Sequence, residues 1–281
     1  EHQAPATAEA LVAVLAALFK DNWGIRTADV LSAALLTLAR TPGANLLWLV
    51  PLLTNPAFRR RVLAMGPPDP LGTGAFWAAY EAKRPQGQAT EIAPVLNKLR
   101  QLIMRPGLRA VLGQSTPRLD LRDILTRRRI VVVNLNRARL GAGASRLLGS
   151  LLLAQLWHHL LSRQALVPER RHIISVFIDE VHDFLAGLPG DLSDALAQSR
   201  SLGAAFHLAH QYRAQLSPQM IQAIETNARN KIYFNLSGTD AAASARLAPG
   251  LEAADFQLLG RYRAYAHLIR RGRPTDWFTI A

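Results

Sequence analysis

The fold is decided by the stretch Ile173-Ile174-Ser175-Val176-Phe177-Ile178-Asp179-Glu180, which runs on into Val181-His182-Asp183-Phe184. Its β-branched and aromatic residues form a continuous apolar run, which predicts a strand buried on both faces of a sheet. Ligands of open α/β sheets bind outside the carboxyl ends of the strands, where acidic groups can hold Mg²⁺ and orient a water. Asp179 and Glu180 are therefore candidate ligands. A strand that ends in a solvated acidic turn explains the same residues equally well, so the surrounding sequence has to decide.

A second predicted strand, Ala204 to His210, is also followed by a polar residue, Gln211. The carboxyl ends of parallel strands lie at the same edge of a sheet. Gln211 could therefore contact the same γ-phosphate or water as Glu180 and report its presence. Alone, a glutamine at this point more often caps a helix or belongs to a turn.

Two arginines are candidates for a finger that reaches the phosphates of a neighbouring subunit. Arg200 closes the helix predicted between the two strands, where an arginine usually complements the helix dipole. Arg229, in Thr226-Asn227-Ala228-Arg229-Asn230, is an alternative candidate for the same role, and its position alone is equally weak evidence for it.

The sequence contains no Gly-x-x-x-x-Gly-Lys-Ser/Thr phosphate loop. Gly141-Ala142-Gly143-Ala144-Ser145-Arg146 resembles such a loop after a strand, but it lacks the lysine and the spacing. Backbone N–H groups at a helix N-terminus there could still approach a phosphate. Without a lysine loop the β- and γ-phosphates have no cradle, so this chain alone should bind nucleotide weakly and hydrolyse little or none.

The order of predicted elements places these residues in the second half of the chain. Residues 1 to about 115 show helical patterns throughout, with Thr27 and Asn55 as candidate N-caps. From Arg118 onward strands alternate with helices, which predicts a parallel, helix-flanked sheet with an antiparallel pair on its edge. The predicted elements of this half are strand Ile130–Asn136, helix Gly143–Gln164, strand His172–Asp179, helix Asp191–Arg200, strand Ala204–His210, helix Pro218–Thr226, strand Lys231–Ser237, helix Thr239–Leu247, and the terminal pair Arg263–Arg270 and Thr275–Ile280, turning at Gly272-Arg273-Pro274.

Composition narrows the class of protein. The chain has 281 residues, 49% of them hydrophobic, which is typical of one large or two smaller globular domains. With no cysteine, disulfides and thiolate metal sites are excluded, and the eight histidines show no metal-ligand spacing. No apolar run reaches the roughly 18 residues of a spanning helix. The first residue is Glu1 rather than Met, which suggests a segment of something longer.

The net charge of +13 predicts a polyanionic partner, nucleic acid first and an anionic membrane surface second. Only four of the 33 cationic residues are lysines. A GC-rich coding sequence would account for arginine over lysine, but it explains the excess of cations over anions less well.

The order of four stretches resembles the DNA-pumping ATPases of the HerA–FtsK group, most closely the coupling-protein ATPases of conjugative type IV secretion. Singly each stretch is weak, but their order and spacing over residues 119 to 247 are fairly specific. The stretches are Leu119–Leu125 leading into Ile130–Asn136 and Leu140-Gly141; Phe177–Phe184; Ala195–Gly203 continuing to Leu208–Tyr212 and Gln215-Leu216; and Asn227–Phe234 followed by Asp240-Ala241.

This resemblance implies an α/β fold, a RecA-like P-loop NTPase core with a mostly parallel, incomplete sheet, preceded by an all-α domain. It implies an N-terminal helix leading out of the ATPase core (1–24), an all-α insertion domain (25–117) and a RecA-like domain with Walker B and sensor motifs (118–281). The Walker A strand and loop, which family members place before the helical insertion, are missing.

The resemblance also implies roles for the site residues. Asp179 would hold Mg²⁺ and ATP as part of the Walker B pair, Glu180 would polarise the attacking water, and Gln211 would be the sensor. Arg200 falls where some coupling proteins have a candidate finger. The implied assembly is a hexameric ring with DNA, double- or single-stranded, in its channel. Relaxase or secretion-channel proteins are further implied partners. The implied location is the cytoplasm, at the inner face of the membrane if an N-terminal region outside this sequence anchors it.

Two other functions remain open. In a non-catalytic adaptor, the helical half docks protein or nucleoprotein substrates and the α/β half is a degenerate ATPase fold. A simple nucleic-acid-binding scaffold would bind duplex with a steep salt dependence and no effect of nucleotide.

Overall fold

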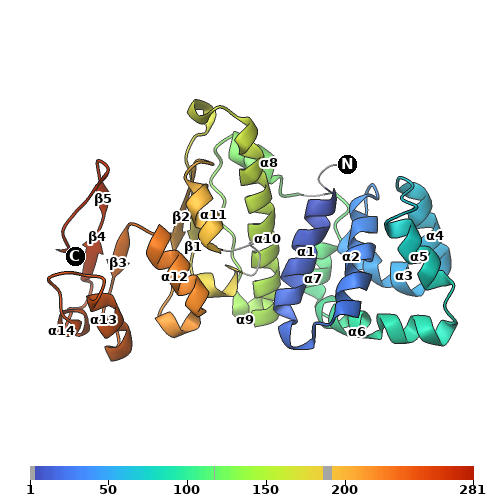
Figure 1. The fold of residues 1–281 in the computed structure, drawn as a ribbon, viewed down its shortest axis with the longest axis horizontal. Coiled ribbons are helices and arrows are strands. Elements are labelled where there is room, and N and C mark those ends of the chain that lie inside the picture. The colour runs from blue at the N-terminus through green and yellow to red at the C-terminus, as the bar shows by residue number, and fades with distance from the viewer. Residues whose placement is uncertain (1–3, 117, 186–191) are drawn as a thin grey trace. The chain divides into compact units, whose positions relative to one another are not determined.

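The computed structural model describes residues 4–116, 118–185 and 192–281 (Figure 1). These residues form two compact units. The first unit holds the described residues up to Ser162 together with Asp183–Leu185. The second holds Arg163–His182 and the described residues from Leu192 onward. The three-part division expected from the sequence stays a prediction, and α10 packs with α1 in the first unit.

The first unit is helical. Asn55 caps α4, as predicted, because its side chain accepts a hydrogen bond from the Phe58 N–H at 3.0 Å. The predicted cap at Thr27 is wrong: Gly24 precedes the helix, and Thr27 is buried inside its first turn. The α-helices are α1 Ala4–Leu18, α2 Ile25–Ala39, α3 Leu49–Thr54, α4 Pro56–Met65, α5 Thr73–Glu81, α6 Pro85–Ile103, α7 Pro106–Leu112, α8 Leu121–Thr126, α9 Arg137–Leu140 and α10 Ala142–Ser162.

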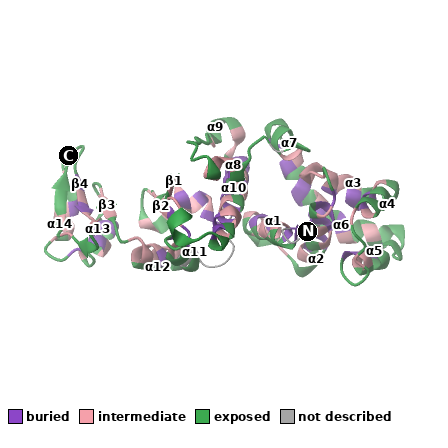
Figure 2. Ribbon diagram, turned by 90° about the horizontal axis from the view of Figure 1, so that it is seen from above, coloured by how far each residue is buried: buried purple, intermediate pink, exposed green. Residues whose placement is uncertain are grey.

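A leucine-rich core holds this unit together, and its buried residues lie along the facing sides of α2, α3 and α6 (Figure 2). Arg59 is buried in it with 1% of its surface exposed. Its guanidinium group donates hydrogen bonds to the Leu52 and Leu53 carbonyls at 3.0 and 3.3 Å and pairs with Glu81 at 2.9 Å. The Trp77 and Tyr80 rings lie beside it at 5.5 and 5.0 Å. A buried charge is tolerated here because its donors are satisfied.

The second unit contains all the strands assigned among the described residues. Two of them form the predicted parallel pair, with Ile174 opposite Ala204 and Ile178 opposite Leu208, and α11 packs against β2 (Figure 1). The elements are β1 Ile174–Ile178, α11 Leu192–Ser199, β2 Ala204–Leu208, α12 Pro218–Asn227, β3 Lys231–Tyr233, α13 Gly238–Ala245, α14 Ala253–Gln257, β4 Ala264–His267, β5 Ile269–Arg270, β6 Arg273–Pro274 and β7 Phe278–Ile280. The predicted helix start at Asp191 lies outside the described residues.

The parallel sheet is smaller than the sequence predicts. Residues 130–136, all of them described, belong to no helix or strand, and Ile130 and Val132 are 95% and 88% exposed. An apolar run becomes a strand only when another strand supplies hydrogen-bond partners, and the run itself does not encode that partner. The expectation of full burial is also wrong for β1, whose residues alternate between half-buried and exposed.

The prediction that β3 continues the parallel sheet is wrong as well. β3 pairs antiparallel with β4, and β4 pairs antiparallel with β7, which makes a separate three-stranded sheet. The terminal antiparallel pair is confirmed, although its strands are divided between two sheets. β4 and β7 pair in the three-stranded sheet, whereas β5 and β6 form a separate two-stranded sheet with its turn at Arg271-Gly272. An aromatic core explains the separation, because Phe256 packs against Tyr233, Tyr265 and Trp277.

None of the helices in the described parts of the chain combines the length and the apolarity needed to cross a bilayer.

Candidate functional site

Asp179 and Glu180 lie at the carboxyl end of β1, next to the carboxyl end of β2. The backbone ladder continues past both strands, because the Ala209 N–H donates to the Ile178 carbonyl and the Val181 N–H donates to the Ala209 carbonyl, each at 3.0 Å. This register brings residues 179–181 beside residues 209–211. The predicted meeting of the two polar strand ends is therefore observed.

Glu180 contacts Gln211, which follows the neighbouring strand. Gln211 Nε2 donates a hydrogen bond to Glu180 Oε1. Gln215 stabilises the turn at Gln211, because its Oε1 accepts hydrogen bonds from the N–H groups of Gln211 and Tyr212 at 3.0 and 3.1 Å. His182 Nδ1 lies 3.5 Å from Glu180 Oε2. The Gln211 amide thus orients the Glu180 carboxylate, and the His182 ring lies beside its other oxygen.

The backbone at Glu180 adopts a left-handed conformation, with φ of +49°. Residues other than glycine enter this region at a cost, and they remain there when the surrounding structure requires it. Here the ladder bonds on both sides of Glu180 impose the conformation. The Glu180 side chain is turned toward Gln211. The residue with the unfavourable backbone conformation is thus the one whose carboxylate contacts Gln211.

Asp179 has the chemistry that Mg²⁺ prefers. Its side chain is exposed, and Oδ1 accepts the Glu180 N–H at 2.9 Å. Magnesium is bound in proteins by one or two carboxylates, with water and phosphate oxygens completing its octahedron. An exposed carboxylate at a strand end fits that pattern. Among residues 4–116, 118–185 and 192–281, no three His, Asp or Glu side chains form a preassembled metal cage.

His210 and Asp240 were not assigned a role from the sequence, and both lie next to this site. Burial lowers the pKa of His210 from its usual 6.5, so its ring is neutral at physiological pH. The Arg213 N–H donates to the buried Asp240 carboxylate at 3.0 Å, and the Arg213 side chain pairs with Glu225. These contacts connect the turn after β2 to α12 and α13. In the sequence, both residues fall in stretches that carry the resemblance, His210 directly before Gln211 and Asp240 in Asp240-Ala241.

The two candidate fingers lie away from Glu180. Arg200 is exposed in the turn before β2, at the opposite end of the parallel pair from Asp179. Arg229 is exposed just before β3, in the sequence that leads into the antiparallel sheet. Neither arginine makes an ion pair within the described chain. The structure therefore does not bring them to the carboxylates of the same chain.

The glycine turn at 141–146 is lined with arginines. Gly141 has a φ of +81°, and a Cβ there would lie 2.6 Å from the Arg105 guanidinium group, which donates to the Leu140 carbonyl at 3.2 Å. Arg137 and Arg146 both pair with the buried Asp183, the latter at 3.1 Å. The start of α10 thus combines a helix N-terminus with three guanidinium groups and one acid. Whether it approaches a phosphate stays a prediction.

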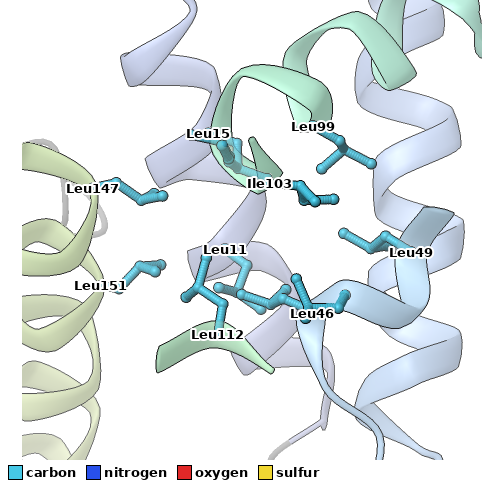
Figure 3. Close-up of a pocket in the computed structure, with 11 residues that line it drawn as sticks. Leu11, Leu15, Leu46, Leu49, Leu99, Ile103, Leu112, Leu147 and Leu151 are labelled. Carbon is cyan, nitrogen blue, oxygen red and sulfur yellow. The ribbon is translucent and has the colours of Figure 1, made fainter. Parts of the chain in front are cut away.

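Two hollows in the helical unit were not anticipated. One is an apolar cavity of about 30 Å³, room for little more than a water molecule and far below the size of a ligand pocket (Figure 3). Its lining includes Leu11, Leu15, Leu99, Leu147 and Leu151. The other is an open, polar hollow of about 640 Å³, lined by Arg26, Lys83, Arg84, Gln86, Gly87, Thr90 and Glu91.

Solved structures of one protein share the fold of nearly the whole chain. The bacterial conjugative coupling protein TrwBdeltaN70, in an unbound form, matches with a TM-score of 0.63 and 14% identity, covering 98% of this chain and 67% of that chain. TrwB with a non-hydrolysable ATP analogue matches at 0.62 and 15%, covering 98% and 68%. TrwB with ADP and Mg²⁺ matches at 0.62 and 15%, covering 98% and 67%.

No protein-family model matches the chain, and no curated protein does. At 14–15% identity the structural likeness establishes the fold. The chain is a mixed α/β protein with the fold of the bacterial conjugative coupling protein in these structures. TrwB is the particular protein whose structures it resembles.

Proposed function

We propose that this chain works in an ATP-driven coupling ATPase that moves DNA in conjugative type IV secretion. The observation that carries the proposal is the contact between Glu180 and Gln211 at the shared carboxyl end of β1 and β2. The fold of TrwB, whose structures include complexes with ADP and Mg²⁺ and with an ATP analogue, supports it. In this proposal hydrolysis between the subunits of a hexameric ring drives DNA through the channel, with relaxase or channel proteins as further partners.

Each residue of the strand ends has a distinct role in the proposed reaction. Asp179 holds Mg²⁺, which neutralises charge on the phosphates during phosphoryl transfer. Glu180 orients the attacking water and accepts its proton. Gln211 hydrogen-bonds to Glu180. When a γ-phosphate is present, the same amide can turn toward it, which releases the Glu180 carboxylate for the water.

The fingers act in trans under this proposal. Arg200 lies at the far end of the parallel pair from Asp179, so it serves the site of a neighbouring subunit. Arg229 is the alternative for the same role. Phosphate binding also requires a lysine-bearing loop, which the printed sequence does not contain. We therefore expect the 281-residue chain alone to hydrolyse little or no ATP.

The test is DNA-stimulated ATP turnover by the protein that carries this chain together with a phosphate-binding loop. Glu180→Gln should lower turnover by about 10²-fold or more while nucleotide binding persists, because only the water-orienting carboxylate is lost. Asp179→Ala should weaken binding of Mg²⁺–ATP as well. Glu169→Gln, an exposed acid of the same unit, is the matched control and should leave turnover unchanged. Normal turnover in Glu180→Gln and Asp179→Ala would refute the assignment.

The second candidate is a substrate-docking adaptor without ATPase activity. The sequence without a lysine-bearing phosphate loop and the open polar hollow on the helical unit favour it. If the chain is an adaptor, we expect a fluorescent ATP analogue to bind weakly to any protein that contains it. Replacing Asp179 should then leave the affinity for the analogue unchanged.

A further inference from the structure

The hairpin of β5 and β6 carries arginines where local stability favours other residues. Arg270 lies directly opposite Arg273 across the two strands. Like charges in directly opposed positions of an antiparallel pair are destabilising. The turn between them consists of Arg271 and Gly272, with φ of +51° and +81°. Turns with two left-handed residues favour Asn-Gly, and an arginine at the first position is unfavourable. Three residues of this hairpin thus oppose its formation.

Nothing in the described chain neutralises this charge. Arg270, Arg271 and Arg273 are exposed, and none of them is in an ion pair with a described residue. From Gly260 to Thr275 the sequence contains five arginines and no acid, and the next residue, Asp276, forms no ion pair with a described arginine. Arg229, also exposed, comes immediately before Asn230, whose side chain contacts the hairpin. The hairpin and the segment that contacts it therefore present four exposed guanidinium groups.

The hairpin is nevertheless held in place. The Ile269 N–H donates to Asn230 Oδ1 at 2.7 Å, and the Thr275 N–H donates to the Leu268 carbonyl at 2.8 Å. The Leu268 N–H donates to Thr275 Oγ1 at 3.1 Å. Behind these contacts the sheet rests on the Phe256 aromatic cluster. The backbone that carries the arginines is thus in place before any ligand arrives, which lowers the ordering cost of binding.

We propose that this hairpin, Ile269–Pro274, binds the phosphate backbone of nucleic acid. Phosphates supply the opposite charge that the facing Arg270 and Arg273 lack, and a two-stranded ribbon fits the major groove of a duplex. Elements that bind membrane surfaces combine basic residues with an apolar face. The tip of this hairpin consists of Arg271 and Gly272, which provide no apolar face. The choice of nucleic acid among polyanions rests on the proposed function, but the binding itself requires no ATP.

The test measures binding of the 281-residue chain to a fluorescently labelled duplex, and to a single strand of the same length, between 50 and 200 mM salt. The variant Arg270→Thr/Arg271→Asn/Arg273→Thr removes three charges and installs an Asn-Gly turn. We expect about tenfold or more weaker binding at about 100 mM salt, and a log–log salt slope smaller by about two to three. We also expect a higher melting temperature, because the like-charge pair and the unfavourable turn residue are gone.

The control replaces three exposed arginines of the helical unit, Arg60, Arg100 and Arg109, with glutamine, which gives the same net charge. Binding that weakens equally in both variants reflects net charge alone and overturns the proposal. The same holds for a wild-type chain that binds no nucleic acid, or that binds phosphatidylserine vesicles but neither the duplex nor the single strand. If the hairpin variant fails selectively, the proposal stands even where the ATP-turnover test fails, since no ATP is present.

Discussion

At the scale of single residues, some charged side chains in this protein form several hydrogen bonds and ion pairs at once. Asp69 is an example in the loop before α5. Its carboxylate accepts the N–H groups of Gly72 and Thr73, each at 3.0 Å, and it pairs with Arg40. The hydrogen bond from Thr73, with that from Arg40, lowers the pKa of Asp69 to about 2. A single side chain thereby fixes the entry into a helix.

The lowered pKa predicts a pH dependence. The folded carboxyl group stays ionised below the pKa of about 3.8 that it has when unperturbed, so its contribution to stability is complete above about pH 4. The contribution is lost as the pH falls toward 2. Asp69→Asn should therefore show a shallower loss of stability between pH 4 and pH 2 than the wild type, in urea unfolding followed by circular dichroism. Glu9→Gln, an exposed acid on α1, is the control, and an identical loss in Asp69→Asn contradicts the prediction.

At the scale of elements, α10 shows how packing overrides helix propensity. Two of its glycines look alike in sequence but differ in surroundings. A Cβ at Gly149 would lie 2.3 Å from the Phe184 ring and 2.8 Å from Leu135. A Cβ at Gly143 would meet no atom within 4 Å. The first glycine is required for close packing, and the second is not.

Alanine at these two positions should have opposite effects. Gly143→Ala should raise the free energy of unfolding by roughly 0.5 kcal/mol, because alanine restricts the unfolded chain more than glycine does. Gly149→Ala should lower it by about 1–3 kcal/mol, because Phe184 and Leu135 must shift. Chemical denaturation of both variants gives the two values. A stabilised Gly149→Ala protein would show that the contact with Phe184 relaxes at no cost.

At the scale of the whole molecule, the two compact units have separate cores. Arg59 and the leucines around it lie in the helical unit, while Phe256, with no exposed surface, centres an aromatic cluster in the other. Separate cores allow separate openings, which hydrogen exchange detects as different protection in the two regions.

A core substitution should therefore act mainly within its own unit. Arg59→Leu leaves the Leu52 and Leu53 carbonyls without their donor and should cost about 3 kcal/mol. Phe256→Ala leaves a cavity and should cost about 3–5 kcal/mol. In hydrogen exchange, the first should speed exchange over residues 25–112 and the second over residues 231–280. Equal acceleration of both regions by either variant would mean that the units unfold together.

Short-range patterns in the sequence were enough to predict much of the candidate site. The apolar run before Asp179 and Glu180 predicts β1, and the next run predicts β2 with Gln211 at its end. Parallel strands share one edge for their carboxyl ends, so the order of elements placed Gln211 near Glu180. The hydrogen bond between the two side chains was not predicted. The Asn55 cap and the helices of the first half were likewise local properties.

Features that depend on pairing between distant segments appeared only in the folded molecule. No local pattern tells that residues 130–136 lack a ladder partner, or that β3 joins β4 and β7 in an antiparallel sheet. The left-handed Glu180 follows from the register of β1 with β2, and the opposition of Arg270 and Arg273 from the turn that joins their strands. Strand register and partner choice are set by contacts across the sheet. Propensity and periodicity cannot predict those contacts, because each is a property of one segment considered alone.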